Sequence, residues 1–349
     1  MQGLDVELKR QVSQAAERDV FSGVVLLAQG DDVALSLACN KACRRFAVPN
    51  EPYTRFDIAS VVKVFTATAI GQLVERGLIV LDAPIAAYVP GLPPILGERV
   101  TVHHLLTHTS GLRSVFDVEG GGPAKEDVWT IGQILAHLPD PPLQFEPGER
   151  WEYSNEGYVL LGAVIEAVTG GPYAEYFREH IFAPAGMGDT GPYARDEEVP
   201  RLAYGYLRAG ASDQREDTPC WKSARRDYPG WQAACCLYST APDLLRFARA
   251  LRRGELVSAP QVALLTGKKV PTGRRPGEHY AYGFFTEDPG GVRIFGHGGM
   301  VPGFQAWFDI FPVLDYTVVV LANFEHPAAF DVGWFMRTRL TGVSPPVLT

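Results

Sequence analysis

The chain has 349 residues and a formal net charge of −8, from 32 basic and 40 acidic side chains. Hydrophobic residues make up 46% and charged residues 21%, which is typical of a globular protein and excludes a mainly disordered chain. No basic stripe is visible, so we expect no nucleic-acid partner. The longest apolar runs are shorter than the ~20 residues of a bilayer-spanning helix, so we expect no membrane partner.

The N-terminal segment and the cysteines indicate where the protein works. Residues 1–10 are amphipathic and charged and lack the apolar core of a signal peptide, so we expect a cytoplasmic protein. Five cysteines, an odd number, do not indicate a disulfide framework. Cys39 and Cys43 have a loose metal-like spacing, but no second pair of Cys or His completes a zinc site, and we predict no metal and no cofactor.

The first part of the chain predicts a helix, a hairpin and a buried helix. Residues 4–18 have helical periodicity, and residues 21–29 and 33–38 flank a Gly-Asp turn as a β-hairpin would. Residues 60–76 are largely apolar all round, and Gly77 stands where a helix would end. We therefore expect that helix to lie between layers of the fold.

The rest of the chain changes character twice. From about residue 83 to 230, Pro and Gly are dense and helical patches alternate with loops, without a run of strands. These patches are residues 102–107, 128–138 and 157–169. Three short strands then predict an antiparallel meander, and a closing helix follows over 328–340. The strands are residues 292–295, 305–311 and 316–322.

Together these elements predict an α+β fold. We expect an antiparallel sheet flanked by helices, an α/β/α sandwich built from both chain ends, with an inserted lobe that is mostly helical. Residues 1–82 and 236–349 would form the sandwich and residues 83–235 the helical lobe. The active site would lie in the cleft between the two lobes.

Ser60-Val-Val-Lys63 is the first candidate for chemistry. Spacing i, i+3 places the serine hydroxyl and the lysine amine on one helix face. A serine becomes a good nucleophile only when a base takes its proton, and a partly desolvated lysine can serve as that base. The N–H of Ser60 would be an unpaired first-turn donor that could hold an oxyanion. The alternative is a capping serine followed by a surface lysine.

Two further segments could join this pair. Tyr153 could present its phenol to a cleft as a proton relay, or it could be a packed core residue with Asn155 capping the next helix. Gly296-His-Gly-Gly-Met300 directly follows a predicted strand, and its glycines would let a substrate approach the backbone. The alternative there is a plain turn between strands.

In combination, these segments resemble the serine β-lactamase and penicillin-binding-protein superfamily. They are most similar to its class C-like branch, which includes family VIII-type esterases, D-aminopeptidases and acyltransferases. The string Leu-Leu-Thr-His-Thr-Ser-Gly-Leu over 105–112 is specific to this branch. The supporting segments follow the family's order, at residues 56–63, 105–112, 153–155, 181–187, 237–244 and 296–300. The resemblance implies a β-lactamase/transpeptidase-like fold.

The resemblance also implies roles for individual residues. Ser60 would be the acyl-enzyme nucleophile, Lys63 would help to deprotonate it, and Tyr153 would be the general base. The N–H groups of Ser60 and Met300 would form the oxyanion hole. Asn155 would hold Lys63 or the substrate, the strand motif would be His297-Gly298-Gly299, and His108 would buttress a loop.

Two departures from the family pattern carry information. His297 occupies the position of a lysine, and a neutral imidazole is a poor anchor for a carboxylate, which favours neutral acyl substrates. An arginine such as Arg293 or Arg225 could instead supply the charge. Cys235 and Cys236 could line the cleft, or they could be two small buried residues.

The predicted function is that of a serine hydrolase with a small-molecule acyl substrate. An esterase is the first choice. An acyltransferase, or an amidase such as a D-aminopeptidase, would use the same acyl-enzyme. A catalytically inactive binding protein is the competing class, and intact Ser60, Lys63 and Tyr153 argue against it. Self-association into a homo-oligomer is left open.

Overall fold

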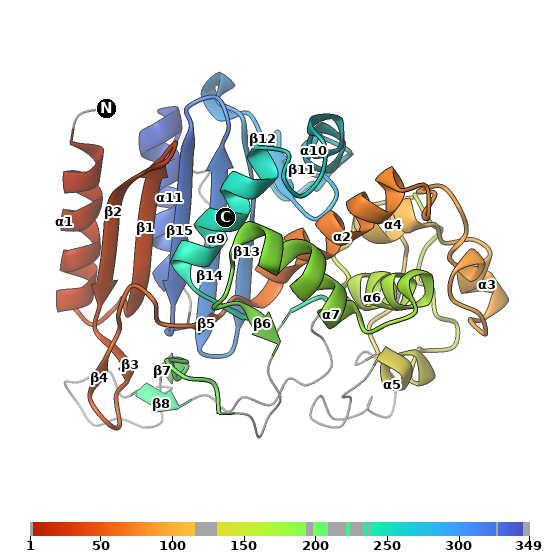
Figure 1. Ribbon diagram of the computed structural model, residues 1–349, viewed down its shortest axis with the longest axis horizontal. Helices are drawn as coiled ribbons and strands as arrows, with labels where there is room; N and C mark the ends of the chain where they lie inside the picture. The colour runs from red at the N-terminus through yellow and green to blue at the C-terminus, as the bar shows by residue number, and fades with distance from the viewer. Residues whose placement is uncertain are drawn as a thin grey trace.

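The computed structural model describes residues 3–115, 131–192, 198–208, 221–223, 233–235, 237–325 and 327–344. Its main feature is an antiparallel sheet that both ends of the chain build together (Figure 1). The strand order is β10-β11-β12-β13-β14-β15-β1-β2, so the N-terminal hairpin pairs with the last strand of the chain. The predicted meander and the contribution of both chain ends are confirmed.

The register of this sheet separates two faces. The strands are β1 (Gly23–Gln29), β2 (Asp32–Cys39), β10 (Val270–Pro271), β11 (His279–Tyr280), β12 (Phe285–Glu287), β13 (Ile294–Val301), β14 (Phe304–Phe311) and β15 (Tyr316–Ala322). His297 of β13 is opposite Phe308 of β14, and Gly298 is opposite Trp307. Because side chains alternate along a strand, Phe308 and Trp307 belong to separate apolar clusters on the two faces.

Helices cover both faces of the sheet. On one face α11 (Ala328–Thr341) contacts β14 and β15, and α1 (Leu4–Glu17) contacts β2 and α11. On the other face α9 (Ala241–Arg252) contacts β1 and β15, while α10 (Ala259–Thr266) packs against α2 (Lys63–Glu75). Figure 1 shows this layered arrangement. The predicted terminal helices and the predicted α+β sandwich are confirmed.

The segment between the two sheet-forming parts is mostly helical where it is described. Its helices are η2 (Ile85–Ala87), α3 (Pro94–Gly97), α4 (Val102–Leu106), α5 (Ile131–Ala136), α6 (Asn155–Thr169), α7 (Tyr173–Phe177), the π-helical η4 (Arg178–Phe182) and α8 (Ala183–Ala185). The division into two lobes stays a prediction.

Short strands and one 3₁₀ turn complete the fold. They are β3 (Lys41–Cys43), β4 (Val48–Pro49), β5 (Phe56–Asp57), β6 (Gly191–Pro192), β7 (Tyr206–Arg208), β8 (Trp221–Ser223), β9 (Leu237–Ser239) and η6 (Pro289–Gly291). Three of the strands, β6, β7 and β8, lie in the segment where the sequence shows no run of strands. They are two or three residues long, which is too short for hydrophobic alternation to reveal.

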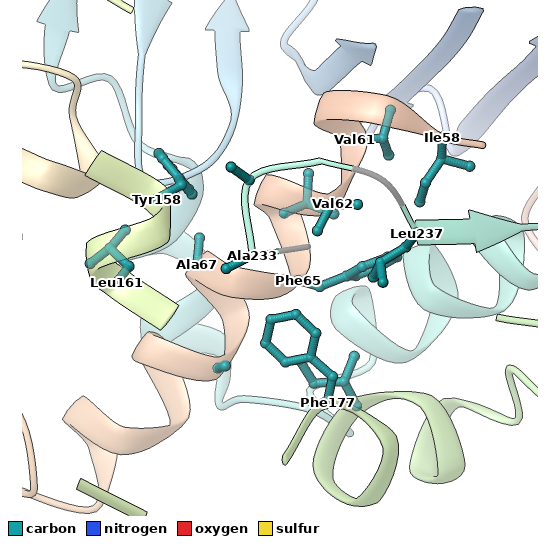
Figure 2. Close-up of a cluster of buried hydrophobic side chains, with 14 of the residues drawn as sticks. Ile58, Val61, Val62, Phe65, Ala67, Tyr158, Leu161, Phe177, Ala233 and Leu237 are labelled. Carbon is teal, nitrogen blue, oxygen red and sulfur yellow. The ribbon is translucent and has the colours of Figure 1, made fainter. Parts of the chain in front are cut away.

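Helix α2 lies in the middle of the larger apolar cluster, as predicted. Figure 2 shows side chains from α2, from the preceding turn and from α6 and α7 around it. The ring of Phe65 packs edge-on against Phe182 and Phe247, with centroids 5.2 and 4.9 Å away. This packing fixes the start of α2, where the candidate nucleophile lies. Across the described part of the chain, no helix is long and apolar enough to cross a membrane.

Candidate active site

Ser60 lies in a tight turn rather than in the first turn of an α-helix. The 3₁₀ helix η1 (Ala59–Val62) carries it between β5 and α2. Ala59 has a φ of 48°, and its N–H donates to Asp57 Oδ1 at 2.8 Å. A left-handed alanine costs about 1–2 kcal/mol and persists only where its surroundings fix the backbone. The turn therefore holds Ser60 in one orientation.

Lys63 is fully buried and its amine is held by three oxygen atoms. Nζ donates to Asn155 Oδ1 at 2.8 Å and to the carbonyl oxygen of Ala234 at 2.7 Å, and it lies 3.4 Å from Ser60 Oγ. An ammonium has three N–H donors, so these three oxygens match its hydrogen-bonding capacity. The structure thus brings Ser60, Lys63 and Asn155 together from η1, α2 and α6.

Tyr153 lies two residues before the start of α6 and faces the same two side chains. Lys63 Nζ lies 4.7 Å from the centroid of its ring. Burial raises the pKa of the Tyr153 phenol well above its ordinary value, and a hydrogen bond with the Ser60 side chain opposes that rise. The phenol is therefore protonated near neutral pH, and it is in direct contact with the candidate nucleophile.

His297 closes the site from β13. Its Nδ1 lies 2.6 Å from the carbonyl oxygen of Gly298, and its Nε2 lies 3.1 Å from Tyr280 Oη. A carbonyl can only accept, so Nδ1 donates to it. Burial, and then the charge of Lys63, lower the pKa of His297 from 6.5 to about 3. The imidazole is therefore neutral near pH 7, as the substrate argument requires.

Gly299 brings the last strand of the site against the nucleophile turn. A Cβ on Gly299 would lie 2.4 Å from the carbonyl oxygen of Ile58 and 3.0 Å from the backbone N of Ser60. Only glycine fits at such a distance. The two segments that carry the predicted oxyanion donors, the N–H groups of Ser60 and Met300, are therefore in contact. The Met300 side chain itself is 59% exposed.

Two of the alternative interpretations of these segments are wrong. Residues 296–300 lie inside β13 and do not form a turn after a strand, because the glycines there serve close packing: a Cβ on Gly296 would lie 2.0 Å from the carbonyl oxygen of Phe308. The cap of α6 is Ser154, whose hydroxyl accepts from the Gly157 N–H at 3.1 Å. Asn155 is thereby free to accept from Lys63.

The cysteine hypothesis is answered for one residue. Cys235 is partly exposed, directly follows the residue that holds Lys63, and contributes to raising the Tyr153 pKa. It therefore lies beside the site. Cys236 is outside the described residues. In the described segments, no group of three or more His, Cys, Asp or Glu side chains could hold a metal ion.

Apart from Tyr153, the aromatic side chains that surround the site were not predicted from the sequence. Tyr280 contacts His297, and the Tyr158 hydroxyl donates to the carbonyl oxygen of Leu106 at 3.0 Å. Trp151 has its ring centroid 6.3 Å from that of Tyr280. The density of aromatic residues from 151 to 158 was visible in the sequence, but Tyr280 comes from a distant two-residue strand and carries no local signal.

A cation near the site was also missed. The Arg274 guanidinium lies 5.1 Å from the centroid of the Phe285 ring, and Phe285 lies 5.0 Å from the His297 ring. Its charge contributes to lowering the pKa of both His297 and Tyr153. Arg293, which the sequence suggested, donates to Thr266 Oγ1 at 3.0 Å instead. Arg225 is outside the described residues.

Comparisons with known proteins point to one family. A family model described as Beta-lactamase matches residues 8–342. The putative penicillin-binding protein PbpX of Bacillus subtilis (strain 168) is 30% identical over 325 residues, covering 93% of this chain and 76% of that protein. Esterase EstB of Burkholderia gladioli is 34% identical over 265 residues, covering 68% of this chain and 67% of that protein.

A solved structure extends the comparison. D-amino acid amidase from Ochrobactrum anthropi SV3, complexed with L-phenylalanine, superposes with a TM-score of 0.77 at 26% identity, covering 95% of this chain and 94% of that chain. The family match spans nearly the whole chain, and relatives described as an esterase and an amidase accompany it. The resemblance predicted from the motifs is confirmed: the chain belongs to the β-lactamase family and is a serine hydrolase of its class C-like branch.

Proposed function

We propose that the protein is an esterase that forms an acyl-enzyme on Ser60 with a small neutral acyl substrate. One observation carries the proposal: Lys63 Nζ lies 3.4 Å from Ser60 Oγ and 4.7 Å from the centroid of the Tyr153 ring, beside an imidazole that stays uncharged. The candidate nucleophile, the candidate proton acceptors and an uncharged side chain therefore lie together in one site.

The active form holds one proton fewer than the resting site. Three oxygens surround Lys63 Nζ as they would an ammonium, and the Tyr153 phenol is protonated because burial raises its pKa. In that state no group can take the proton of Ser60. Loss of one proton from the Lys63–Tyr153 pair creates the base, and the pKa that governs this step belongs to the pair.

Acylation then follows from the placement of these groups. Ser60 Oγ attacks the ester carbon and transfers its proton to the Lys63–Tyr153 pair, while the N–H groups of Ser60 and Met300 stabilise the oxyanion. The C–O bond to the alcohol breaks and the pair returns the proton to that oxygen. Water repeats the steps in deacylation, which releases a carboxylic acid and restores the Ser60 hydroxyl.

The charge of the site supports a neutral acyl group. A lysine ammonium at position 297 would form a charge-assisted hydrogen bond with a substrate carboxylate, and a neutral imidazole forfeits most of that energy. The relative described as an esterase supports the same reaction. The likeness to D-amino acid amidase favours amide cleavage as the second candidate, and transfer to an amine or alcohol would use the same acyl-enzyme. Location in the cell and self-association stay predictions.

Covalent labelling of Ser60 tests the proposal. The wild type should react with a fluorophosphonate and cleave p-nitrophenyl butyrate, and intact mass should show one adduct. Ser60→Ala should lose both reactions and keep its melting temperature. Ser36→Ala is the matched control, because Ser36 is exposed on β2. Turnover by Ser60→Ala at the wild-type rate would overturn the mechanism, and an unlabelled, inactive wild type would favour a binding protein.

A further inference from the structure

His108 forms hydrogen bonds with the backbone on both sides of Tyr153. Its carbonyl oxygen accepts from the Glu152 N–H at 2.8 Å, and its ring Nδ1 accepts from the Ser154 N–H at 3.1 Å. Its ring also packs on the Tyr153 ring, with centroids 4.3 Å apart. One residue therefore holds both neighbours of the candidate proton relay and the phenol ring itself.

These contacts require a neutral imidazole with its proton on Nε2. A backbone N–H only donates, so Nδ1 must keep its lone pair to accept from Ser154. Burial, and then the charge of Lys63, hold the pKa of His108 well below its ordinary value. A second proton would place two donors face to face and break the hydrogen bond.

Two features of His108 lower the stability of the folded protein. It follows α4 with a φ of 58°, where glycine or asparagine is the favoured residue. Its Nε2 is buried with no hydrogen-bond partner among the described residues. A residue that only ended the helix would need neither the ring nor the buried nitrogen. A strained backbone conformation indicates a functional position when the surrounding contacts hold a candidate catalytic side chain, here Tyr153.

We propose that His108 is a positioning residue that holds the Tyr153 phenol against Ser60 through the backbone of Glu152 and Ser154 and through ring packing. The inference rests on the proposed function, because it concerns the proton relay of that reaction. His108 does not touch the reacting atoms in this role. It sets the distance and angle at which Tyr153 exchanges a proton with Ser60.

Two substitutions separate the contacts. His108→Asn supplies an acceptor close to the place of Nδ1 and tolerates the left-handed backbone, but it removes the ring. His108→Phe keeps a ring and removes the acceptor, so the buried Ser154 N–H loses its partner. His104→Asn is the matched control: it is the same substitution in α4, where the His104 ring accepts from the Thr101 N–H at 3.2 Å and has no contact with Tyr153 among the described residues.

The measurements are kcat and KM for p-nitrophenyl butyrate per fluorophosphonate-titrated site, the pH profile of kcat/KM, and the melting temperature. Misplacement of a catalytic group by about 1 Å can cost roughly 10²-fold in rate. We expect kcat to fall roughly tenfold in His108→Asn and roughly 10²-fold in His108→Phe, with KM nearly unchanged. The apparent pKa should rise in both, because the hydrogen bond from Ser60 that lowers the Tyr153 pKa weakens. His104→Asn should change only the melting temperature.

Variants that lose only melting temperature or titratable sites, with wild-type kcat and apparent pKa at each site, would overturn the inference. A wild type without ester turnover would instead overturn the proposed function, and the rate of Ser60 labelling would still compare the variants. If the variants do not fold, ¹⁵N-histidine NMR of the wild type decides. We expect a neutral His108 with its proton on Nε2, and a proton on Nδ1 would contradict the proposal.

Discussion

Two buried polar regions lie on opposite faces of the same sheet. They differ in whether burial leaves their side chains charged or uncharged. On the face toward α11, Arg337 pairs with both oxygens of Asp309 at 2.7 Å and also contacts Glu287. Burial lowers the Arg337 pKa, but Asp309 and Glu287 outweigh it, and the pKa is raised. On the face toward α2, burial holds the pKa of His297 and His108 low and that of Tyr153 high.

The difference shows what each region does. The Arg337 region matches a buried cation with carboxylates, so its charges are fixed and its protons do not move. In the active site, the oxygens that accept from Lys63 include a side-chain amide, a backbone carbonyl and the nucleophile itself. The Lys63 amine therefore lies beside groups that burial keeps uncharged, an arrangement in which protons can be exchanged. Similar burial thus gives a structural anchor where opposite charges meet, and it gives the arrangement that we propose as a proton relay where they do not.

The largest expected effect concerns the relay. Lys63→Ala and Tyr153→Phe should each lower kcat/KM about 10²–10⁴-fold, the usual contribution of a positioned acid–base group. Their effects should not add, because the two residues share one proton. The measurement is kcat/KM of both single variants and of the double variant. A double variant as slow as the product of both losses would show that the residues act independently.

The same pair sets the pH dependence. Because the Tyr153 pKa is raised, the one-proton-fewer form becomes common only as pH increases, so kcat/KM should rise with pH. The apparent pKa should differ in Tyr153→Phe, since it belongs to the pair. A pH–rate profile of both proteins tests this. A wild-type rate that falls steadily from neutral to alkaline pH, in protein that stays folded, would contradict the relay.

Arg337→Met should lower the stability of the fold without changing the rate of catalysis. Removal of the cation leaves the buried Asp309 carboxylate without its arginine, while Glu287 keeps Arg275 at 3.6 Å, and the loss costs about 3–5 kcal/mol of unfolding free energy. Urea unfolding measures this, and kcat per titrated site should remain at the wild-type value. Arg178→Met is the control, because its ion pair is exposed and worth about 1 kcal/mol or less. Equal losses in both variants would remove the contrast.

The contacts of the candidate active site are easier to predict from the sequence than those of the Arg337 region, for a physical reason. Ser60 and Lys63 are three residues apart in a continuous turn and helix, so local spacing predicts their contact. The partners of Arg337 lie 28 and 50 positions away on two strands, and only strand register brings them together. His108 is an intermediate case. Its motif is visible in the sequence, but its hydrogen bonds with residues 152 and 154 depend on tertiary packing.

A smaller effect concerns stability against pH. The folded-state pKa of His297 is about 3, against 6.5 when unfolded, so the unfolded chain binds more protons between these values. The contribution is complete above 6.5 and is lost as pH falls toward 3, at up to about 1.4 kcal/mol per pH unit. Urea unfolding near pH 7 and near about pH 4.5 should show a shallower loss in His297→Gln than in the wild type. Parallel losses would contradict the buried neutral imidazole.

The smallest expected effect concerns substrate charge. Short-chain p-nitrophenyl esters should be cleaved readily and carboxylate-bearing β-lactams slowly, because a charge-assisted hydrogen bond worth ~1.5–3 kcal/mol is absent at His297. His297→Lys should raise kcat/KM for a penicillin roughly tenfold or more without helping a neutral ester, and His297→Gln controls for the loss of the ring. Arg274 lies near Phe285 and is the competing source of charge. If the wild type cleaves a penicillin efficiently and Arg274→Gln abolishes that activity, the carboxylate anchor is Arg274, and the neutral-substrate argument from His297 fails.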